Sequence, residues 1–407
     1  MFPSVLHSTK SKLVTVELSL PSRARGAYRT LVSWSKTAVS TLLSLRLPIY
    51  RLEADESDDR PEVIYLGAGT NLNLITHLIC GHALEPKPVT HTSLFGLHAT
   101  IDRMKAKCNL MVIELPHRLL GRLVHRDGFL VIPWVRWQIK TQRPWREIEQ
   151  GFHRTSVRSD LKKLEESSVQ CPRTQERSAL ERFYWDIYRP FIRSQHGDMA
   201  ESTPLNLLRS YFDAGWLTLY VENNQLLGGA VQYVADGVLH DYVMGFKEDI
   251  SRRQQTVAAT ANYYDALRSG WETNCRAVDF GLTRPLLNDG VARYKRKWGS
   301  TVMTDPSQNW GLWIHVSRNT ALAVRFLSRH PWIWVDRDRK LKGLLVIDNQ
   351  DRALSKPEVT KACKRLWAPG LHSVIVYATR GFTTGVDLSQ GPIPAIGPAT
   401  EWNPLTE

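Results

Sequence analysis

The sequence has few cysteines, and none of them forms a pairing pattern. Its 407 residues include five cysteines, which lie far apart and contain no C-x-x-C pair. A disulfide framework uses an even number of cysteines at regular spacings, and a structural zinc site uses close pairs of ligands. We therefore expect neither, and a reducing cytoplasm is the compartment that fits this usage.

Metal-binding motifs and long apolar runs are also missing. The thirteen histidines include no H-E-x-x-H, and the pairs His77/His82 and His91/His98 are not spaced like neighbouring ligands on one helix face. The longest uncharged apolar candidate near the beginning, residues 37–45, is far shorter than the roughly 18 residues of a membrane span. We expect no metal ion and no membrane-spanning helix.

Acidic residues are scarce relative to basic ones. The chain has 40 Asp and Glu against 53 Lys and Arg, a formal net charge of +13. Such a balance favours a polyanionic partner, which could be a nucleic acid, a phosphorylated cofactor or an acidic membrane surface. Net charge affects association with a partner and does not indicate the fold.

The length predicts two or three domains, and composition suggests where they divide. Residues 1–60 form a basic, partly helical lead, either transit-peptide-like or an amphipathic helix, and the acidic, proline-ended segment 53–61 marks its end. The helical alternative rests on one apolar stripe: Leu31, Trp34, Ala38, Leu42 and Leu45. Residues 61–150 form an α/β half, in which GFLVIPWVRW has the pattern of a strand. Residues 381–407 form a Gly- and Pro-rich tail.

A glycine-containing segment near residue 67 is similar to a dinucleotide-binding turn. EVIYLGAGTNLNLITHLI passes from an apolar strand through Gly67 and Gly69 into a helical pattern, but Leu72 stands where the third glycine belongs. Both nucleotide binding and a tight structural turn remain open at this point.

Residues 151–304 contain a fixed order of elements. A charged helix over 156–167 and helices near 176–195 and 203–214 precede three strands joined by turns at Asn223-Asn224 and Asp236-Gly237. A helix from about Gln255 to Thr273 then leads to the strand CRAVDFG. We expect an antiparallel meander, a helix and a further strand.

The stretch 278–299, VDFGLTRPLLNDGVARYKRKWG, ends in a basic cluster with aromatic residues between the cations. Ligands of α/β proteins bind at the carboxyl ends of strands, so these cations could form one wall of an anion-accepting site. A solvated surface loop is the alternative. The cluster comprises Arg293, Tyr294, Lys295, Arg296, Lys297 and Trp298.

Residues 152–300 resemble the FemAB-like and CelD-like branch of the GNAT N-acyltransferases. The resemblance is carried by VRSDLKKLEE, Gly245-Phe246 after the meander, Asp279-Phe280-Gly281 on the next strand, and the closing YKRKWG. It implies an α/β (α+β) fold with a GNAT-like mixed sheet flanked by helices. We expect two GNAT-like halves, the acyltransferase core at 151–304, and a small C-terminal ββαβ unit at 305–380.

The resemblance also implies a donor site. Acyl-CoA, with acetyl-CoA first, would rest its pyrophosphate on free backbone N–H groups at a helix start. Thr256 replaces the central glycine of the family's phosphate loop, so its Cβ would obstruct the phosphate while its hydroxyl could donate a hydrogen bond. The matching cofactor-binding residues are Arg252, Arg253, Gln254, Gln255, Thr256, Val257 and Ala258.

Candidate catalytic residues lie on two strands and in the closing motif. Asp241 is the expected base, and His240 must point to the opposite sheet face because the period of a strand is two. Asp279 is either catalytic or caps the Gly281 turn, and Lys295 could hold a phosphate, a substrate carboxylate or the developing oxyanion. The expected substrate-binding residues are His240, Tyr242, Tyr294 and Trp298.

Three functions follow as alternatives. The first is transfer of an acyl group from acyl-CoA to the amine of a small molecule or peptide-like acceptor by direct attack. The second is FemAB-type transfer from aminoacyl-tRNA, to which the net charge of +13 is suited. The third is a GNAT-fold protein that mediates interactions without catalysis. The acceptor, the acyl chain length and the oligomeric state stay open.

Overall fold

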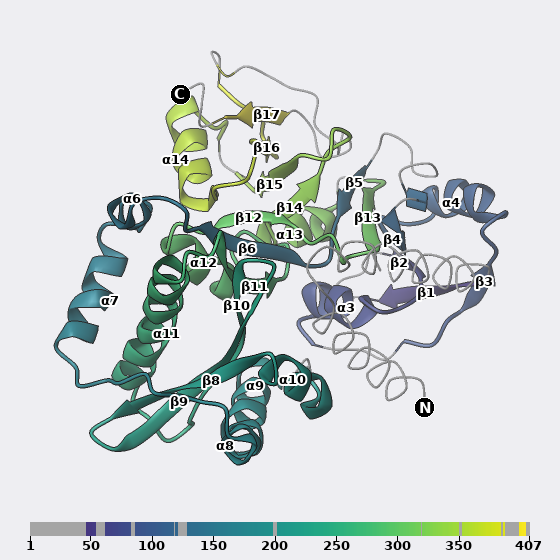
Figure 1. Cartoon of the computed structure of the whole chain (residues 1–407). Coiled ribbons are helices and arrows are strands. Elements are labelled where there is room, and N and C mark those ends of the chain that lie inside the picture. Colours follow the sequence, from purple (N-terminus) through teal and green to yellow (C-terminus); the bar gives the residue numbers. More distant parts are fainter. Residues whose placement is uncertain are drawn as a thin grey trace. The chain divides into compact units, whose positions relative to one another are not determined.

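The computed structural model describes residues 46–53, 62–82, 86–117, 119–120, 128–197, 202–318, 320–349, 352–383, 386 and 399–403. The predicted amphipathic lead and most of the predicted Gly- and Pro-rich tail lie outside these residues. The described chain divides into two compact units (Figure 1). The first contains Arg136–Leu282 and Tyr294–Thr301, and the second contains Thr283–Arg293 and the remaining described residues.

The first unit is built on a seven-stranded mixed sheet with the strand order β12-β6-β11-β10-β9-β8-β7, in which β12 is Thr301–Thr304. Strands β8, β9 and β10 form the predicted antiparallel meander, and β11 is parallel to β10. Its strands are β6 (Val135–Lys140), β7 (Arg173–Thr174), β8 (Gly215–Glu222), β9 (Gln225–Ala235), β10 (Val238–Phe246) and β11 (Ala277–Thr283).

The two hairpin turns of the meander have the backbone that their residues favour. Asn223 and Asn224 have φ of 51° and 63°, and Asp236 and Gly237 have φ of 51° and 68°. Positive φ at both central positions defines the type I′ turn, whose twist matches that of the flanking strands. The meander predicted from the sequence is confirmed.

Helices cover both faces of this sheet. The helix α11 packs its small residues Ala258 and Ala261 against Tyr220 and Phe246, while η1 and α10 pack against Leu217 and Val231. These helices are α6 (Trp145–Gln150), α7 (Ser156–Glu165), α8 (Arg177–Arg182), the π-helix η1 (Phe183–Tyr188), α9 (Arg189–His196), α10 (Leu205–Phe212) and α11 (Arg252–Glu272). The chain leaves this unit after Leu282, re-enters it within α12 (Gly290–Lys297), and leaves it again within β12 (Thr301–Thr304).

The π-helix η1 lies where a proline interrupts a long helical run. Pro190 has no N–H to donate and its ring would clash with the carbonyl of the preceding turn, so a widened turn accommodates it. This turn lies directly on β10, since a Cβ on Gly245 would come 2.9 Å from the Cα of Tyr188. The glycine at position 245 is thus needed for close contact between helix and strand.

The second unit contains a ten-stranded sheet in the order β17-β16-β15-β14-β5-β13-β4-β2-β1-β3. Its early elements are β1 (Leu47–Glu53), β2 (Glu62–Gly67), α3 (Leu72–Cys80), β3 (Thr90–Thr92), α4 (Leu97–Lys105), β4 (Leu110–Pro116) and β5 (Gly128–Val131). Its later elements are β13 (Trp310–Val316), α13 (Ala321–Arg329), β14 (Trp332–Val335), β15 (Leu341–Ile347), α14 (Lys356–Leu366), β16 (Val374–Ala378) and β17 (Ala399–Trp402). The mixed α/β class predicted from the sequence is confirmed.

The structure divides the chain differently from the predicted boundaries at 150 and 304. GFLVIPWVRW is two strands, β5 and β6, because Pro133 ends one ladder and cannot donate to the next. β14, β15, α14 and β16 do form a ββαβ order, but they continue the sheet of the N-terminal strands, with β14 pairing with β5. Strands from distant parts of the sequence belong to one sheet, because the hydrogen bonds between strand edges do not require the strands to be neighbours in sequence.

Candidate functional site

The first unit carries a histidine–carboxylate pair at the point where two strands part. The parallel pairing of β10 with β11 has three partners, and the last of them is His240 opposite Asp279. Beyond this pair, Gly281 adopts φ +74° and donates its N–H to Asp279 Oδ1 at 2.9 Å. A positive φ suits glycine and turns the strand, so β11 leaves β10 here.

His240 is held in a defined orientation. Its Nδ1 lies 2.8 Å from Asp279 Oδ2, and its ring stacks on Tyr233 with centroids 4.6 Å apart. Among the described residues, none forms a hydrogen bond with Nε2, and the side chain is 20% exposed. A carboxylate accepts, so Nδ1 carries the proton and Nε2 presents a lone pair.

Asp279 is kept ionised by its surroundings. Its side chain is 1% exposed, and burial alone would raise its pKa. The hydrogen bond from His240 and the charge of Arg136, which forms an ion pair with Oδ2, outweigh burial and lower the pKa. Asp279 thus caps the Gly281 turn, which is one of the two roles expected for it, and it also contacts His240.

Aromatic residues surround this pair. Tyr211 of α10 stacks on Tyr233 with centroids 4.8 Å apart and lies 4.0 Å from Tyr242. Tyr242 is the extra residue of a β-bulge, since the register of β10 with β9 shifts between Asp241 and Val243. Bulges redirect side chains and are frequent beside functional sites. The bulge therefore places a third tyrosine ring near His240.

Asp241 lies on the other sheet face, as the alternation of the strand predicts. It is buried and accepts hydrogen bonds from Gln232 Nε2 at 3.2 Å and Asn262 Nδ2 at 2.6 Å. Burial raises its pKa to about 6, although these two hydrogen bonds and the charge of Lys295 act in the opposite direction. Its oxygens are directed to side chains of β9 and α11, so an acceptor amine would have to displace them.

Asp241 belongs to a buried polar network on that face. Thr218 and Trp216 donate to Gln232 Oε1 at 3.0 and 3.1 Å, and Tyr220 donates to Asn262 Oδ1. Each group in this chain has a partner, which is the condition under which buried polar side chains are tolerated. The network ties β8, β9 and β10 to α11.

The predicted cofactor-binding segment forms the first turns of α11 rather than a loop before it. Ser251 caps the helix: its Oγ accepts from Gln254 N at 3.2 Å, and the Gln254 side chain accepts from Ser251 N at 3.0 Å. Thr256 Oγ1 donates to Arg252 O at 2.8 Å, so its hydroxyl is already engaged. The pattern S-x-x-Q is a capping box and could have been recognised in the sequence.

The basic cluster of the closing motif is largely turned inward. Lys295 is 4% exposed and donates from Nζ to Leu282 O at 3.0 Å. Lys297 forms an ion pair with Asp160 at 2.5 Å and lies 3.7 Å from the Tyr294 ring centroid. Burial raises the pKa of Tyr294 to about 12. Trp298, 1% exposed, packs with its ring centroid 5.2 Å from that of Phe152.

The glycine turn near residue 67 is closed by a carboxylate of the protein. Glu114 of β4 is fully buried and accepts from Tyr65 at 2.6 Å, from the Thr70 N–H at 2.9 Å and from Asn71 at 2.7 Å. A phosphate at this turn would need the same N–H groups. The tight structural turn is thus the alternative that the geometry supports.

Two further surveys cover only the described ranges. No helix in them is both long and apolar enough to cross a membrane. Likewise, no group of three or more His, Cys, Asp and Glu side chains in the described residues could hold a metal ion. Sequence reasoning did not single out Arg136, Gln232, Tyr233 or Asn262, since only the paired strands bring them to the site.

No protein-family model matches the chain, and no curated protein matches it. Among solved structures it is similar to the crystal structure of FemX, at 11% identity and a TM-score of 0.36, over 70% of this chain and 90% of that one. L-PGS from Bacillus licheniformis aligns at 10% identity and a TM-score of 0.32, over 69% and 84%. A GCN5-related N-acetyltransferase from Sphaerobacter thermophilus aligns at 12% and 0.29, over 67% and 77%. The function proposed below rests on the geometry of the site.

Proposed function

We propose that the chain transfers an acyl group to an amine, and that His240 is the general base. The observation that carries this proposal is the contact of His240 Nδ1 with Asp279 Oδ2 at 2.8 Å, which leaves Nε2 without a partner among the described residues. An imidazole held in one tautomer by a buried carboxylate is suited to proton abstraction. This role replaces the expectation that Asp241 is the base.

In the proposed reaction the acceptor amine attacks the acyl carbonyl directly. The new C–N bond forms, the bond from carbonyl carbon to the leaving sulfur or oxygen breaks, and the ammonium proton passes to His240 Nε2. His240 then returns this proton to the leaving group, which restores the neutral imidazole. Asp279 and Arg136 fix the imidazole by the hydrogen bond and ion pair described above and do not exchange protons.

The parted strands support an extended acyl donor. After His240 the edge of β10 facing β11 has no further ladder partner on β11. An unpaired strand edge offers N–H and C=O groups to an extended ligand with amides, such as the pantetheine arm of acyl-CoA. Acyl-CoA, with acetyl-CoA first, is therefore the first donor to test, and a small or peptide-like amine is the acceptor class.

The hydrogen bonding at the start of α11 favours a second donor, aminoacyl-tRNA. The N–H groups of Ser251 and Gln254 are already engaged in the capping box, so a pyrophosphate would compete with bonds inside the protein. Transfer from aminoacyl-tRNA needs no pyrophosphate at this helix start. It is the alternative, and its binding would weaken steeply with salt because each phosphate contact releases a counterion.

The test compares His240→Gln with a matched control. Turnover is followed as thiol release from acetyl-CoA with lysine, glucosamine and a lysyl peptide as amines, and as transfer of labelled amino acid from charged tRNA to the same amines. We expect His240→Gln to lower kcat/KM about 10²- to 10⁴-fold, since general-base catalysis contributes that much. His153→Gln, at an exposed histidine of the same unit, should leave it unchanged.

Two results would contradict the proposal. If His240→Gln turned over as fast as the parent across pH 5 to 9, His240 would not be the base. If the parent transferred from neither donor to any amine, the chain would be better described by the third alternative, an interaction protein without catalysis. Asp279→Asn should act through the histidine, lowering kcat more than it raises KM.

A further inference from the structure

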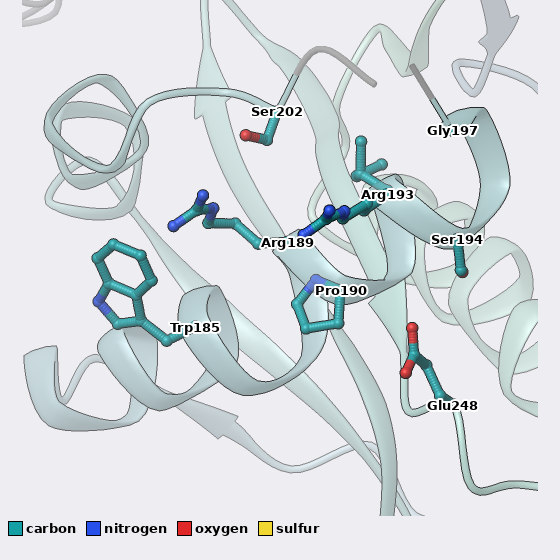
Figure 2. Close-up of a pocket in the computed structure, with 9 residues that line it drawn as sticks. Trp185, Arg189, Pro190, Arg193, Ser194, Gly197, Ser202 and Glu248 are labelled. Carbon is teal, nitrogen blue, oxygen red and sulfur yellow. The ribbon is translucent and has the colours of Figure 1, made fainter. Parts of the chain in front are cut away.

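A cavity separate from the His240 site lies along α9 (Figure 2). It has a volume of about 650 Å³, within the range of small-ligand pockets, and is lined by residues of η1, α9, the segment after α9 and the β10–α11 connection. The six residue steps from His240 to Phe246, where β10 ends, span roughly 20 Å of extended strand, and Glu248 of the connection lies two residues beyond.

The lining contains two cations whose charges are not neutralised by described residues. Arg189 and Arg193 form no ion pair with any described acidic residue, and neither does Glu248, which borders the same cavity. On the neighbouring helices α8 and α11, Arg177 is paired with Asp213 at 3.2 Å and Arg268 with Glu272 at 2.8 Å, whereas Arg252 and Arg253 at the start of α11 also have no described acidic partner. Two guanidinium groups bordering one hollow repel each other, which an anion would relieve.

An exposed indole stands beside these cations. Trp185 is 52% exposed, unusual for the largest apolar side chain, and the Arg189 guanidinium lies 4.8 Å from its ring centroid. In Figure 2 the Arg189 side chain extends over Trp185 toward Ser202, while Glu248 lies on the other side of Pro190. The hollow therefore joins a flat apolar face to donors suited to phosphate.

The local backbone fixes this arrangement. Trp185 lies within the widened turn η1 and Arg189 begins α9, so the π-helix sets the angle between them. The turn is pressed against β10 at Gly245, which limits its movement. A preorganised pair of this kind loses little side-chain entropy when a ligand binds.

We propose that this cavity, the nucleotide groove, binds a nucleotide, with the base stacked on Trp185 and the phosphates held by Arg189 and Arg193. Guanidinium groups bind phosphate oxygens in pairs, and indole rings stack on bases of any kind. Ser202 offers a hydroxyl that no described residue engages. With two cations and the single carboxylate of Glu248, the site suits one or two phosphates rather than a long polyanion. This inference does not depend on the transfer reaction.

The test is titration calorimetry on the full chain with ADP, adenosine and inorganic pyrophosphate as probes. We expect ADP to bind more tightly than either fragment. Arg193→Gln and Trp185→Leu should each raise the Kd for ADP at least tenfold, since each removes one of the two recognised parts. Arg177→Gln, on the neighbouring α8, should change the Kd less than twofold.

Four outcomes would overturn the proposal. The first is no binding of ADP to the parent at 1 mM ADP, and the second is equal binding of ADP to the parent and to both groove variants. In the third, pyrophosphate binds as tightly as ADP and Trp185→Leu has no effect, which would show that the base does not contact the site. Loss of ADP binding in Arg253→Gln but not in Arg193→Gln would place the nucleotide at the start of α11. Unchanged thermal unfolding of each variant shows that folding is intact.

Discussion

Replacing Asp241 by Asn should remove the pH dependence of stability that this buried carboxyl imposes. Its pKa is raised from 3.8 to about 6 in the folded chain, first because of burial. Between these two values the folded state holds a proton that the unfolded state has released, so stability falls as pH rises. The penalty is absent below about pH 3.8 and fully present above about pH 6.

The magnitude follows from the size of the shift. A rise in the pKa from 3.8 to about 6 corresponds to about 3 kcal/mol, most of which is lost between pH 4 and pH 7. Asn removes this titration but directs an NH2 group at Gln232 or Asn262, both of which donate to Asp241. Two donors that face each other without an acceptor lower the free energy of unfolding by about 1–3 kcal/mol at every pH.

The free energies of unfolding of the parent and of Asp241→Asn, plotted against pH, should therefore converge or cross. The parent should be more stable than Asp241→Asn at pH 4, and this advantage should shrink by about 2–3 kcal/mol by pH 7. Urea unfolding followed by far-UV circular dichroism at half-unit pH intervals measures the difference, in which other titrating groups cancel. A difference that is constant with pH, or that grows in favour of the parent as pH rises, would refute the reasoning.

Four other changes give sharp expectations. Arg136→Gln should raise the pKa of Asp279 toward its ordinary value. A carboxyl group whose pKa is lowered on folding stabilises the fold, and this stabilisation is lost as the pH falls through the folded-state pKa. Acid unfolding of Arg136→Gln should therefore begin at a higher pH than that of the parent. Glu114→Gln should lower the free energy of unfolding, measured in urea, by about 1–3 kcal/mol, since its NH2 would face groups that already donate. Gly67→Ala should destabilise by about 2 kcal/mol or more, because its φ is +145° and a Cβ would lie 2.3 Å from Glu114 O; failure of the variant to unfold earlier in thermal melts would contradict this. Gly245→Ala should lower the melting temperature by separating η1 from β10, and it should weaken ADP binding as well.

The parts of the fold that could be predicted are those specified by neighbouring residues. The meander follows from alternating apolar residues and from Asp236-Gly237, whose positive φ values the structure confirms. The helix after it was also expected, but it begins at Arg252, three residues before the predicted Gln255. The missed capping box at Ser251 accounts for that difference.

The candidate site could be predicted only in part, because its contacts join distant segments. That His240 and Asp241 face opposite sides follows from the strand period. That His240 meets Asp279 depends on a parallel register between residues 39 positions apart, and Arg136 reaches Asp279 over 143 positions. No local pattern specifies such a register, so composition and spacing predicted Asp241 as the base, whereas the contact of His240 with Asp279 became visible only in the structure.

The basic stretch 278–299 shows how a charge pattern can serve the interior. Asp279 closes the ladder with β10, Gly281 bends β11 away, and Lys295 then returns from α12 to donate to Leu282 O at the end of the same strand. A buried ammonium on a strand carbonyl holds the bent end in place, so Lys295 supports the parting of β10 and β11. Arg293 of this stretch is exposed, and exposed cations also lie on α9, where Arg189 and Arg193 border one cavity without a described acidic partner. Basic residues of this chain thus have two different roles. The buried Arg136–Asp279 ion pair orients His240, and the exposed guanidinium groups of Arg189 and Arg193 border the proposed nucleotide groove.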